Sequence, residues 1–167
     1  MNYRDTVSQM RGFRQRDRGQ FNREEDVDCL PGCALLMRRD VLLRIGLFDP
    51  VFSPAYFEDT DWCVRAQKAG YRIVYVPNAK IWHKVSMSSG GAYNAWERYW
   101  LAYHSVTFMR RYGKPAQWVK YLFYAFGSWP FVFAFRSLRG QGRVAYSKFV
   151  GLIDGLRGVR REEYILR

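Results

Sequence analysis

The pattern of apolar and polar positions changes character twice along the chain. Residues 1–27 are polar and rich in arginine, with almost no periodic apolar positions, and this composition is typical of a mobile loop or a disordered arm. From Cys29 onward, short apolar runs alternate with turn residues, and the last part of the chain is helical in its spacing and rich in aromatic residues. We therefore expect three parts: a basic arm at 1–27, an α/β region at 28–92 and a helical tail at 93–167.

The α/β region is expected to hold three strands and two helices. The continuous apolar run 33–37 predicts a strand that is buried on both faces. Residues 71–76, a segment rich in β-branched and aromatic residues, and the shorter segment 79–83 predict two further strands. A short helix at 41–45, capped by Asp40, comes between the first strand and the second helix. This order predicts an α/β fold with a mixed sheet and flanking helices.

The second helix follows an acidic stretch. From Trp62 the small and apolar residues recur at the spacing of one helix face, and Asp61 and Arg65 form an i, i+4 pair on another face. Either Asp59 or Thr60 is expected to be its N-cap. A carboxylate there lies near the positive end of the helix dipole and is expected to be ionised, as a general base must be. The alternative is that these acids only cap the helix or lie on its surface.

The C-terminal part contains three aromatic or amphipathic segments. Helices are predicted at 96–109 and 145–156, and between them 121–135 is an uncharged aromatic run flanked by Lys120 and Arg136. This run is shorter than the roughly 20 residues that a membrane-spanning helix needs. It suits either a membrane interface or a buried helix pair that packs on the sheet or on another subunit.

Composition limits the choice of partners. The length of 167 residues fits about one domain, and the net charge of +12 indicates an anionic partner: nucleic acid, a phospholipid surface or a phosphorylated substrate. Nucleic acid is not favoured, because no aromatic stacking platform accompanies the arginines of the arm. The three cysteines form no framework of pairs, which favours a reducing compartment. No apolar stretch follows Met1, so we expect no signal peptide.

Taken together, the motifs between residues 32 and 83 resemble the C-terminal half of a family 2 glycosyltransferase with the GT-A fold. Within that family the rhamnosyltransferase-like enzymes of bacterial polysaccharide synthesis are the most similar. The motifs are Gly-Cys-Ala-Leu-Leu-Met-Arg-Arg at 32–39, Gly-Leu-Phe-Asp at 46–49, Tyr-Phe-Glu-Asp-Thr-Asp-Trp-Cys-Val-Arg at 56–65, Gly-Tyr-Arg-Ile at 70–73, Pro77, and Trp-His at 82–83. The resemblance covers about residues 28–90 and continues more weakly into the tail, so we expect a partial GT-A fold followed by a membrane-associating tail.

The resemblance implies an inverting transfer of a sugar from a nucleotide-diphosphate sugar to a glycan or a lipid-linked acceptor. Asp59 matches the family's general base, which takes the proton of the acceptor hydroxyl. Glu58 and Asp61 match neighbours that shape the acceptor pocket and brace the helix. His83 matches a ligand of the divalent metal, Mg²⁺ or Mn²⁺, that neutralises charge on the leaving diphosphate. The resemblance assigns no residue of this sequence to the binding of the nucleotide.

The resemblance also implies a missing part. Members of the family bind the donor nucleotide with an N-terminal βαβ half that carries an Asp-x-Asp metal motif, and neither feature is present before Cys29. The sequence is then an acceptor-side half: a truncated product, one chain of a split enzyme that works with a separate donor-binding half or as a homo-oligomer, or a degenerate copy. We expect it in the cytoplasm, at the inner face of the plasma membrane. The alternative is a non-catalytic basic module that binds an anionic membrane or a partner glycosyltransferase.

Overall fold

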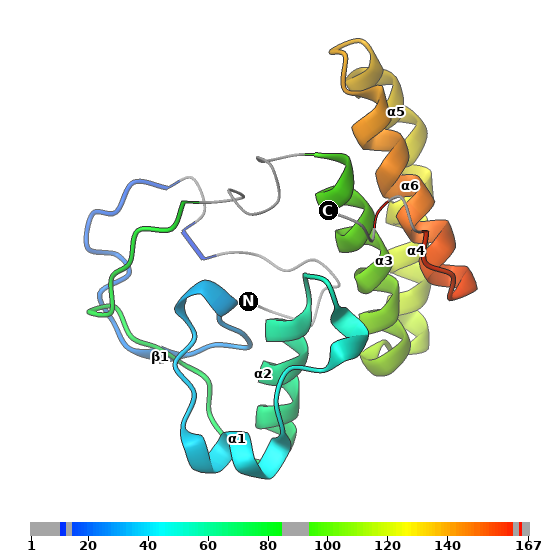
Figure 1. The fold of residues 1–167 in the computed structure, drawn as a ribbon. Coiled ribbons are helices and arrows are strands. Elements are labelled where there is room, and N and C mark those ends of the chain that lie inside the picture. The colour runs from blue at the N-terminus through cyan, green and yellow to red at the C-terminus, as the bar shows by residue number, and fades with distance from the viewer. Residues whose placement is uncertain (1–10, 13–14, 85–93, 162–163, 165–167) are drawn as a thin grey trace. The chain divides into compact units, whose positions relative to one another are not determined.

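A computed structural model describes residues 11–12, 15–84, 94–161 and 164 (Figure 1). The chain divides into two compact units. The first unit comprises the chain up to Val51 together with Glu58–His83, and the second comprises Phe52–Phe57 together with the chain from Lys84 onward. Each unit has its own hydrophobic core, and the two are described separately below.

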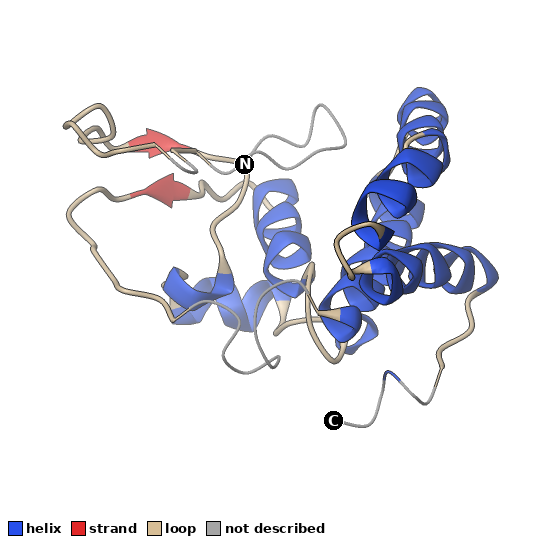
Figure 2. Ribbon diagram, turned by 90° about the horizontal axis from the view of Figure 1, so that it is seen from above, coloured by secondary structure: helices blue, strands red, loops and turns tan. Residues whose placement is uncertain are grey.

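The first unit contains two short helices and a two-stranded antiparallel sheet (Figure 2). Its elements are β1 (Glu25–Asp26), a 3₁₀ turn (Gly32–Ala34), α1 (Arg39–Ile45), α2 (Glu58–Lys68) and β2 (Val74–Tyr75). Glu25 pairs with Tyr75 and Asp26 pairs with Val74. The segment 1–27, predicted to be a loop or a disordered arm, therefore contains the strand β1. Among the described residues, one antiparallel pair of strands stands in place of the predicted mixed sheet.

The strand predictions were wrong at two places and too long at a third. Residues 33–37 begin in the 3₁₀ turn and continue as extended chain outside any sheet, with Leu36 97% exposed. Residues 79–83 form no strand, and only Val74–Tyr75 of the segment 71–76 is paired. A strand is stable only when a neighbouring strand pairs with its backbone N–H and C=O groups. Within the described part of the first unit, no strand pairs with residues 33–37.

The two helix predictions in the first unit are confirmed, but the predicted caps are wrong. Arg38 is the N-cap of α1, so Asp40 lies in the first turn, where it pairs with the Arg38 guanidinium. The second helix begins at Glu58, so Asp59 lies inside its first turn as well. In both helices the carboxylates still lie close to the positive end of the helix dipole, where they are favourable.

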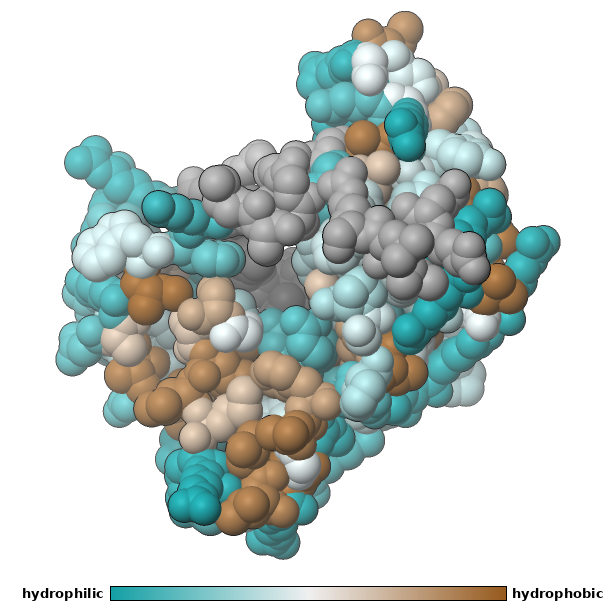
Figure 3. Space-filling view, viewed as in Figure 1, coloured by the Kyte–Doolittle hydropathy of each residue, from teal (hydrophilic) through white to brown (hydrophobic). Residues whose placement is uncertain are grey.

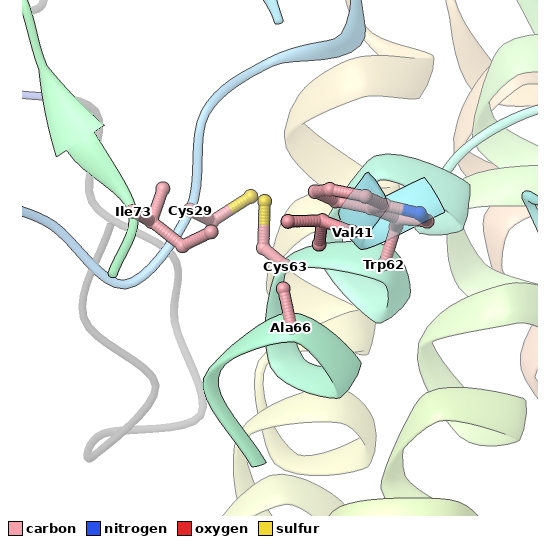
Figure 4. Close-up of a cluster of buried hydrophobic side chains, with 6 residues drawn as sticks. All are labelled: Cys29, Val41, Trp62, Cys63, Ala66 and Ile73. Atoms are coloured by element: carbon pink, nitrogen blue, oxygen red, sulfur yellow. The ribbon is translucent and has the colours of Figure 1, made fainter. Parts of the chain in front are cut away.

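The core of the first unit forms where α1 and α2 meet the chain around β1 and β2. Trp62 is 3% exposed, and its indole Nε1 donates to the carbonyl oxygen of Gly46 at 3.0 Å, which links α2 to the end of α1. The sulfur atoms of Cys29 and Cys63 point toward one another (Figure 4). The six buried residues of this core are Cys29, Val41, Trp62, Cys63, Ala66 and Ile73.

The second unit is helical and rich in aromatic residues, as predicted for the tail. Its helices are α3 (Ala95–Tyr112), α4 (Pro115–Gly127), α5 (Trp129–Ser137) and α6 (Gly142–Arg157). Ser128 separates α4 from α5, so the predicted aromatic run 121–135 is divided between two helices. Over the residues that the structure places, no helix is both long enough and apolar enough to cross a membrane.

The core of the second unit lies between α3 and α6, where aromatic rings stack. The rings of Tyr99 and Tyr164 are parallel within 3° with centroids 4.1 Å apart, and Trp100 is fully buried beside them. The short segment Phe52–Phe57 belongs to this unit because it packs on α3. The ring of Phe52 contacts that of His104 edge-on at 5.6 Å.

Candidate functional site

Asp59 is held in the first turn of α2 by hydrogen bonds to both of its oxygens. Its Oδ2 accepts from the backbone N–H of Gly32 at 2.8 Å, and its Oδ1 accepts from the N–H of Thr60 at 2.6 Å and from the Thr60 hydroxyl at 3.1 Å. The bond to Gly32 spans 27 residues of sequence and ties the helix to the 3₁₀ turn. The carboxylate is only partly buried, so its orientation is fixed while it keeps access to solvent.

Asp61 lies in the same turn but is fully buried. Its Oδ2 accepts from Nε of Arg65 at 2.8 Å, which confirms the predicted i, i+4 pair. The Arg65 guanidinium also donates to the carbonyl oxygens of Ile45 at 2.6 Å and Leu47 at 2.7 Å. Asp61 and Arg65 therefore fasten α2 to the C-terminal end of α1.

Glu58 and His83 occupy different environments from the two aspartates. Glu58 is the first residue of α2 and is partly buried. His83 follows the exposed Trp82, outside any helix or strand, and its own side chain is exposed. Of the four predicted site residues, the three acids share the first turn of α2, and in the described residues no hydrogen bond or ion pair joins His83 to Asp59.

The two residues directly before α2 were not anticipated from the sequence. Tyr56 and Phe57 have φ values of 74° and 73°, in the region that side chains other than glycine rarely adopt. Such conformations cost about 1–3 kcal/mol each and persist only where the surroundings enforce them. Here contacts between aromatic rings enforce them. The ring centroids of Tyr56 and Trp96 are 6.0 Å apart, and those of Phe57 and Phe108 are 5.4 Å apart. No sequence signal for this turn exists, because an aromatic pair does not favour positive φ.

The buried cysteines of the first unit, Cys29 and Cys63, are unsuited to nucleophilic chemistry. The pKa of the Cys63 thiol is raised by its hydrogen bond with Cys29 and by burial. Cys63 is fully buried, and only a thiolate is a good nucleophile.

The residues around His83 do not by themselves make a metal site. Mg²⁺ and Mn²⁺ prefer several oxygen ligands, commonly from carboxylates. Within the described ranges no three His, Cys, Asp or Glu residues are grouped so that they could hold a metal ion. His83 alone does not supply the donor set that the predicted metal requires.

An apolar groove of about 740 Å³ lies in the first unit. It is lined by the exposed side of the 35–37 segment, by Val41 and Trp62 of the two helices, and by the chain around β2. Figure 3 shows apolar side chains gathered on the surface in the region of α1. None of the predicted site residues lines this groove.

Comparison with known proteins gives two kinds of match. The model of a family described as "Glycosyltransferase like family 2" matches residues 2–101. Two proteins named N-acetylglucosaminyl-diphospho-decaprenol L-rhamnosyltransferase, from Mycobacterium tuberculosis strains CDC 1551 / Oshkosh and ATCC 25618 / H37Rv, are each 40% identical over 67 residues. The match covers 40% of this chain and 22% of each relative, so the chain corresponds to about a fifth of their length. No solved structure matches significantly.

Proposed function

Because the chain belongs to glycosyltransferase family 2, we propose that it supplies the acceptor side of an inverting sugar transfer. The donor is a nucleotide-diphosphate sugar, and Asp59 is the general base. The observation that carries the proposal is the fixed orientation of the Asp59 carboxylate by Gly32 and Thr60. In the reaction the acceptor hydroxyl gives its proton to Asp59 while its oxygen attacks the anomeric carbon, and the nucleotide diphosphate leaves from the opposite face.

The hydrogen bonds of Asp59 leave room for the acceptor. An ionised carboxylate has about four lone-pair positions. Three donors occupy the carboxylate: Thr60 supplies two of them to Oδ1, and Gly32 supplies one to Oδ2. The position that remains belongs to Oδ2, and we assign it to the acceptor hydroxyl. A general base must reach the proton within hydrogen-bond distance, and a carboxylate that cannot rotate meets this requirement without further ordering.

The two neighbouring acids take supporting roles in this proposal. Asp61 is a positioning residue, because it is buried against Arg65 and cannot touch a substrate. Glu58 lies at the start of the helix, partly buried, and would border the acceptor. For the acceptor itself we propose a lipid-linked saccharide, since the mycobacterial relatives are named for transfer to a decaprenol-linked diphosphate sugar.

The donor side is proposed to come from polypeptide outside these 167 residues. The chain matches only 22% of each relative, and the groove beside the 35–37 segment offers an apolar surface for further polypeptide. We propose that the nucleotide-binding half, and the carboxylates that would hold a metal with His83, belong to that additional polypeptide. It could be joined to this chain or separate from it.

The test of the base is Asp59→Asn, assayed in the full-length parent or in a complex with a donor-binding half. Removing a general base is expected to lower kcat by about 10²–10⁴-fold. Asp40→Asn is the matched control, because Asp40 is an exposed acid in the first turn of the neighbouring helix, and this variant should keep native activity. Undiminished transfer by the Asp59 variant would refute the role of Asp59.

The second candidate function is a non-catalytic basic module, which the net charge of +12 favours. Calorimetry of the isolated chain with UDP, GDP and dTDP in the presence of Mn²⁺, alongside His83→Ala, tests whether a donor site lies within these 167 residues. Binding that needs both the metal and His83 would support a surviving donor site. No binding at about millimolar nucleotide would mean that the binding free energy is weaker than about −4 kcal/mol, and it would place the donor site elsewhere.

A further inference from the structure

The helices α4 and α5 each carry an exposed apolar stripe. On α4 the stripe repeats every four residues, and Val119 and Phe123 are each 72% exposed. On α5 it runs through Phe131, 79% exposed, and Phe135, and ends at Leu138 directly after the helix, 89% exposed. Single exposed apolar residues are ordinary, but stripes on two consecutive helices mark an interaction surface.

The inner faces of the same helices already hold them in place. Trp118 and Tyr121 of α4 pack on a buried cluster formed by α3 and α6, and the ring of Trp129 at the start of α5 lies 4.3 Å from that of Phe149 on α6. Neither α4 nor α5 contains a fully buried residue. The outer stripes therefore contribute little to the core and are available to a partner.

The charge of this region selects the partner. The stretch from Arg98 to Ile153 contains nine lysines and arginines and no aspartate or glutamate. Lys120 lies within the α4 stripe, and the guanidinium of Arg139 lies 4.2 Å from the ring centre of Phe135. A second copy of the chain would bring the same positive charge and be repelled, whereas an anionic surface would be attracted.

We propose that the α4–α5 face, formed by Val119, Phe123, Tyr124, Phe131, Phe135 and Leu138, binds the surface of an anionic phospholipid bilayer. Aromatic and aliphatic side chains flanked by basic residues are the composition of helices that lie in a membrane interface. The rings enter the headgroup region, and the basic groups contact lipid phosphates. This inference does not depend on sugar transfer, because it concerns α4 and α5 only.

The test is co-sedimentation of the full chain with vesicles of phosphatidylcholine and phosphatidylglycerol, compared with phosphatidylcholine alone. We expect binding to the anionic vesicles that weakens with salt. Phe123→Ser/Phe131→Ser should lower the partition coefficient between vesicles and water about tenfold or more, because two rings that would be half-buried in the membrane are lost. Leu43→Ser/Leu47→Ser is the matched control: these residues are 75% and 71% exposed in the first unit, and their variant should bind as the native chain does.

A charge variant tests the second part of the proposal. Arg139→Gln should weaken binding to the anionic vesicles about fivefold and leave circular dichroism unchanged. Native binding by both the Phe123/Phe131 variant and Arg139→Gln would overturn the proposal. So would sedimentation equilibrium without lipid that finds a dimer of the native chain and a monomer of the Phe123/Phe131 variant, because a second copy would then cover the face.

Discussion

Asp59 and Asp61, two positions apart on α2, have different surroundings. Asp61 is fully buried and forms an ion pair with Arg65, whereas Asp59 is partly exposed and bonds to backbone N–H groups and a hydroxyl. A buried ion pair contributes to stability only while both partners remain, since removal of one leaves an uncompensated charge. Under the proposed function, loss of Asp59 affects sugar transfer, whereas loss of Asp61 is expected to affect folding because Asp61 is buried in the ion pair.

The Arg65 guanidinium permits a specific test of this distinction. It makes three hydrogen bonds in different directions, to Asp61, Ile45 and Leu47, and a lysine ammonium on a flexible stem cannot reproduce that planar geometry. We expect Arg65→Lys to lower the free energy of unfolding by about 1–3 kcal/mol, measured by urea denaturation. Lys68→Arg on the exposed side of the same helix is the control and should change it little. Equal stability of Arg65→Lys would show that charge alone suffices.

His104 is a neutral histidine inside the second unit. It is fully buried, and its Nδ1 lies 2.7 Å from the carbonyl oxygen of Ala55. A carbonyl oxygen only accepts, so Nδ1 carries the proton and Nε2 does not. Burial lowers the pKa of His104 to about 4, with a smaller contribution from the Arg160 charge, against the bond to Ala55, which raises it.

This pKa predicts how the stability of the second unit depends on pH. In the unfolded chain the histidine titrates near its ordinary pKa of about 6.5, so between that value and about 4 the unfolded state binds more protons. Stability is therefore complete above about pH 6.5 and decreases as the pH falls to about 4, by up to about 3 kcal/mol. Urea denaturation across this range should show the decrease, and His104→Gln should show a smaller one. The same pH dependence in both proteins would assign it to other groups.

At the scale of elements, two glycines on α6 allow it to approach α3 closely. A Cβ at Gly151 would lie 2.3 Å from the carbonyl oxygen of Tyr99, and one at Gly155 would lie 3.0 Å from that of Tyr103. Both contacts are with backbone atoms of α3, which cannot move without shifting the helix. The four-residue spacing of these glycines places both on the same face of α6.

Gly151→Ala is expected to destabilise the chain by about 1–3 kcal/mol, because the added methyl group forces the two helices apart. Gly127→Ala, at the end of α4, is the matched control, since a Cβ there meets nothing within 4 Å. An alanine at that position should be neutral or stabilising by up to about 1 kcal/mol. Thermal unfolding followed by circular dichroism measures both. A neutral Gly151→Ala would mean that α6 can shift without cost.

The elements also show why some predictions succeeded. The helices were predictable because their hydrogen bonds and side-chain pairs are local, as with Asp61 and Arg65, whose spacing alone predicted their contact. The strands were not, because an apolar run such as 33–37 pairs only if a suitable edge exists elsewhere. The turn at Tyr56 and Phe57 was missed for a third reason: packing on α3 imposes a backbone conformation that the residues themselves disfavour.

Those features of the candidate site that depend on local sequence could be predicted, and those that join distant segments could not. The acidic cluster could be read from sequence because all three carboxylates fall within one helical turn. The hydrogen bond between Gly32 and Asp59 could not, because it joins two segments 27 residues apart. Nor could local pattern decide what surrounds His83, whose role as a metal ligand stays a prediction.

At the scale of the whole molecule, the charge of +12 is distributed unevenly. The described ion pairs of the first unit, such as Arg72 with Asp26, offset part of its charge. In the second unit the stretch from Arg98 to Ile153 has no acidic residue to do so. Like charges held in a compact unit repel, and unfolding relieves the repulsion, so the second unit should be less stable at low ionic strength.

We therefore expect sodium chloride to stabilise the chain. Raising the salt from about 10 mM to about 100 mM shortens the Debye length from about 30 Å to about 10 Å. A gain of about 1 kcal/mol would raise the midpoint of thermal unfolding by about 2–4 °C. The exposed ion pairs act in the opposite direction, but each contributes only about 0–1 kcal/mol.

A single substitution tests whether repulsion is the cause. Arg143 lies exposed in the first turn of α6, where a positive charge is also unfavourable to the helix dipole. Arg143→Glu should raise the midpoint of thermal unfolding at low salt and reduce the rise in that midpoint when salt is added. Arg143→Gln should give about half of each change. A midpoint that falls steadily as sodium chloride is added would show instead that attractive ion pairs dominate. The net charge would then matter for the binding of anionic partners and not for the stability of the fold.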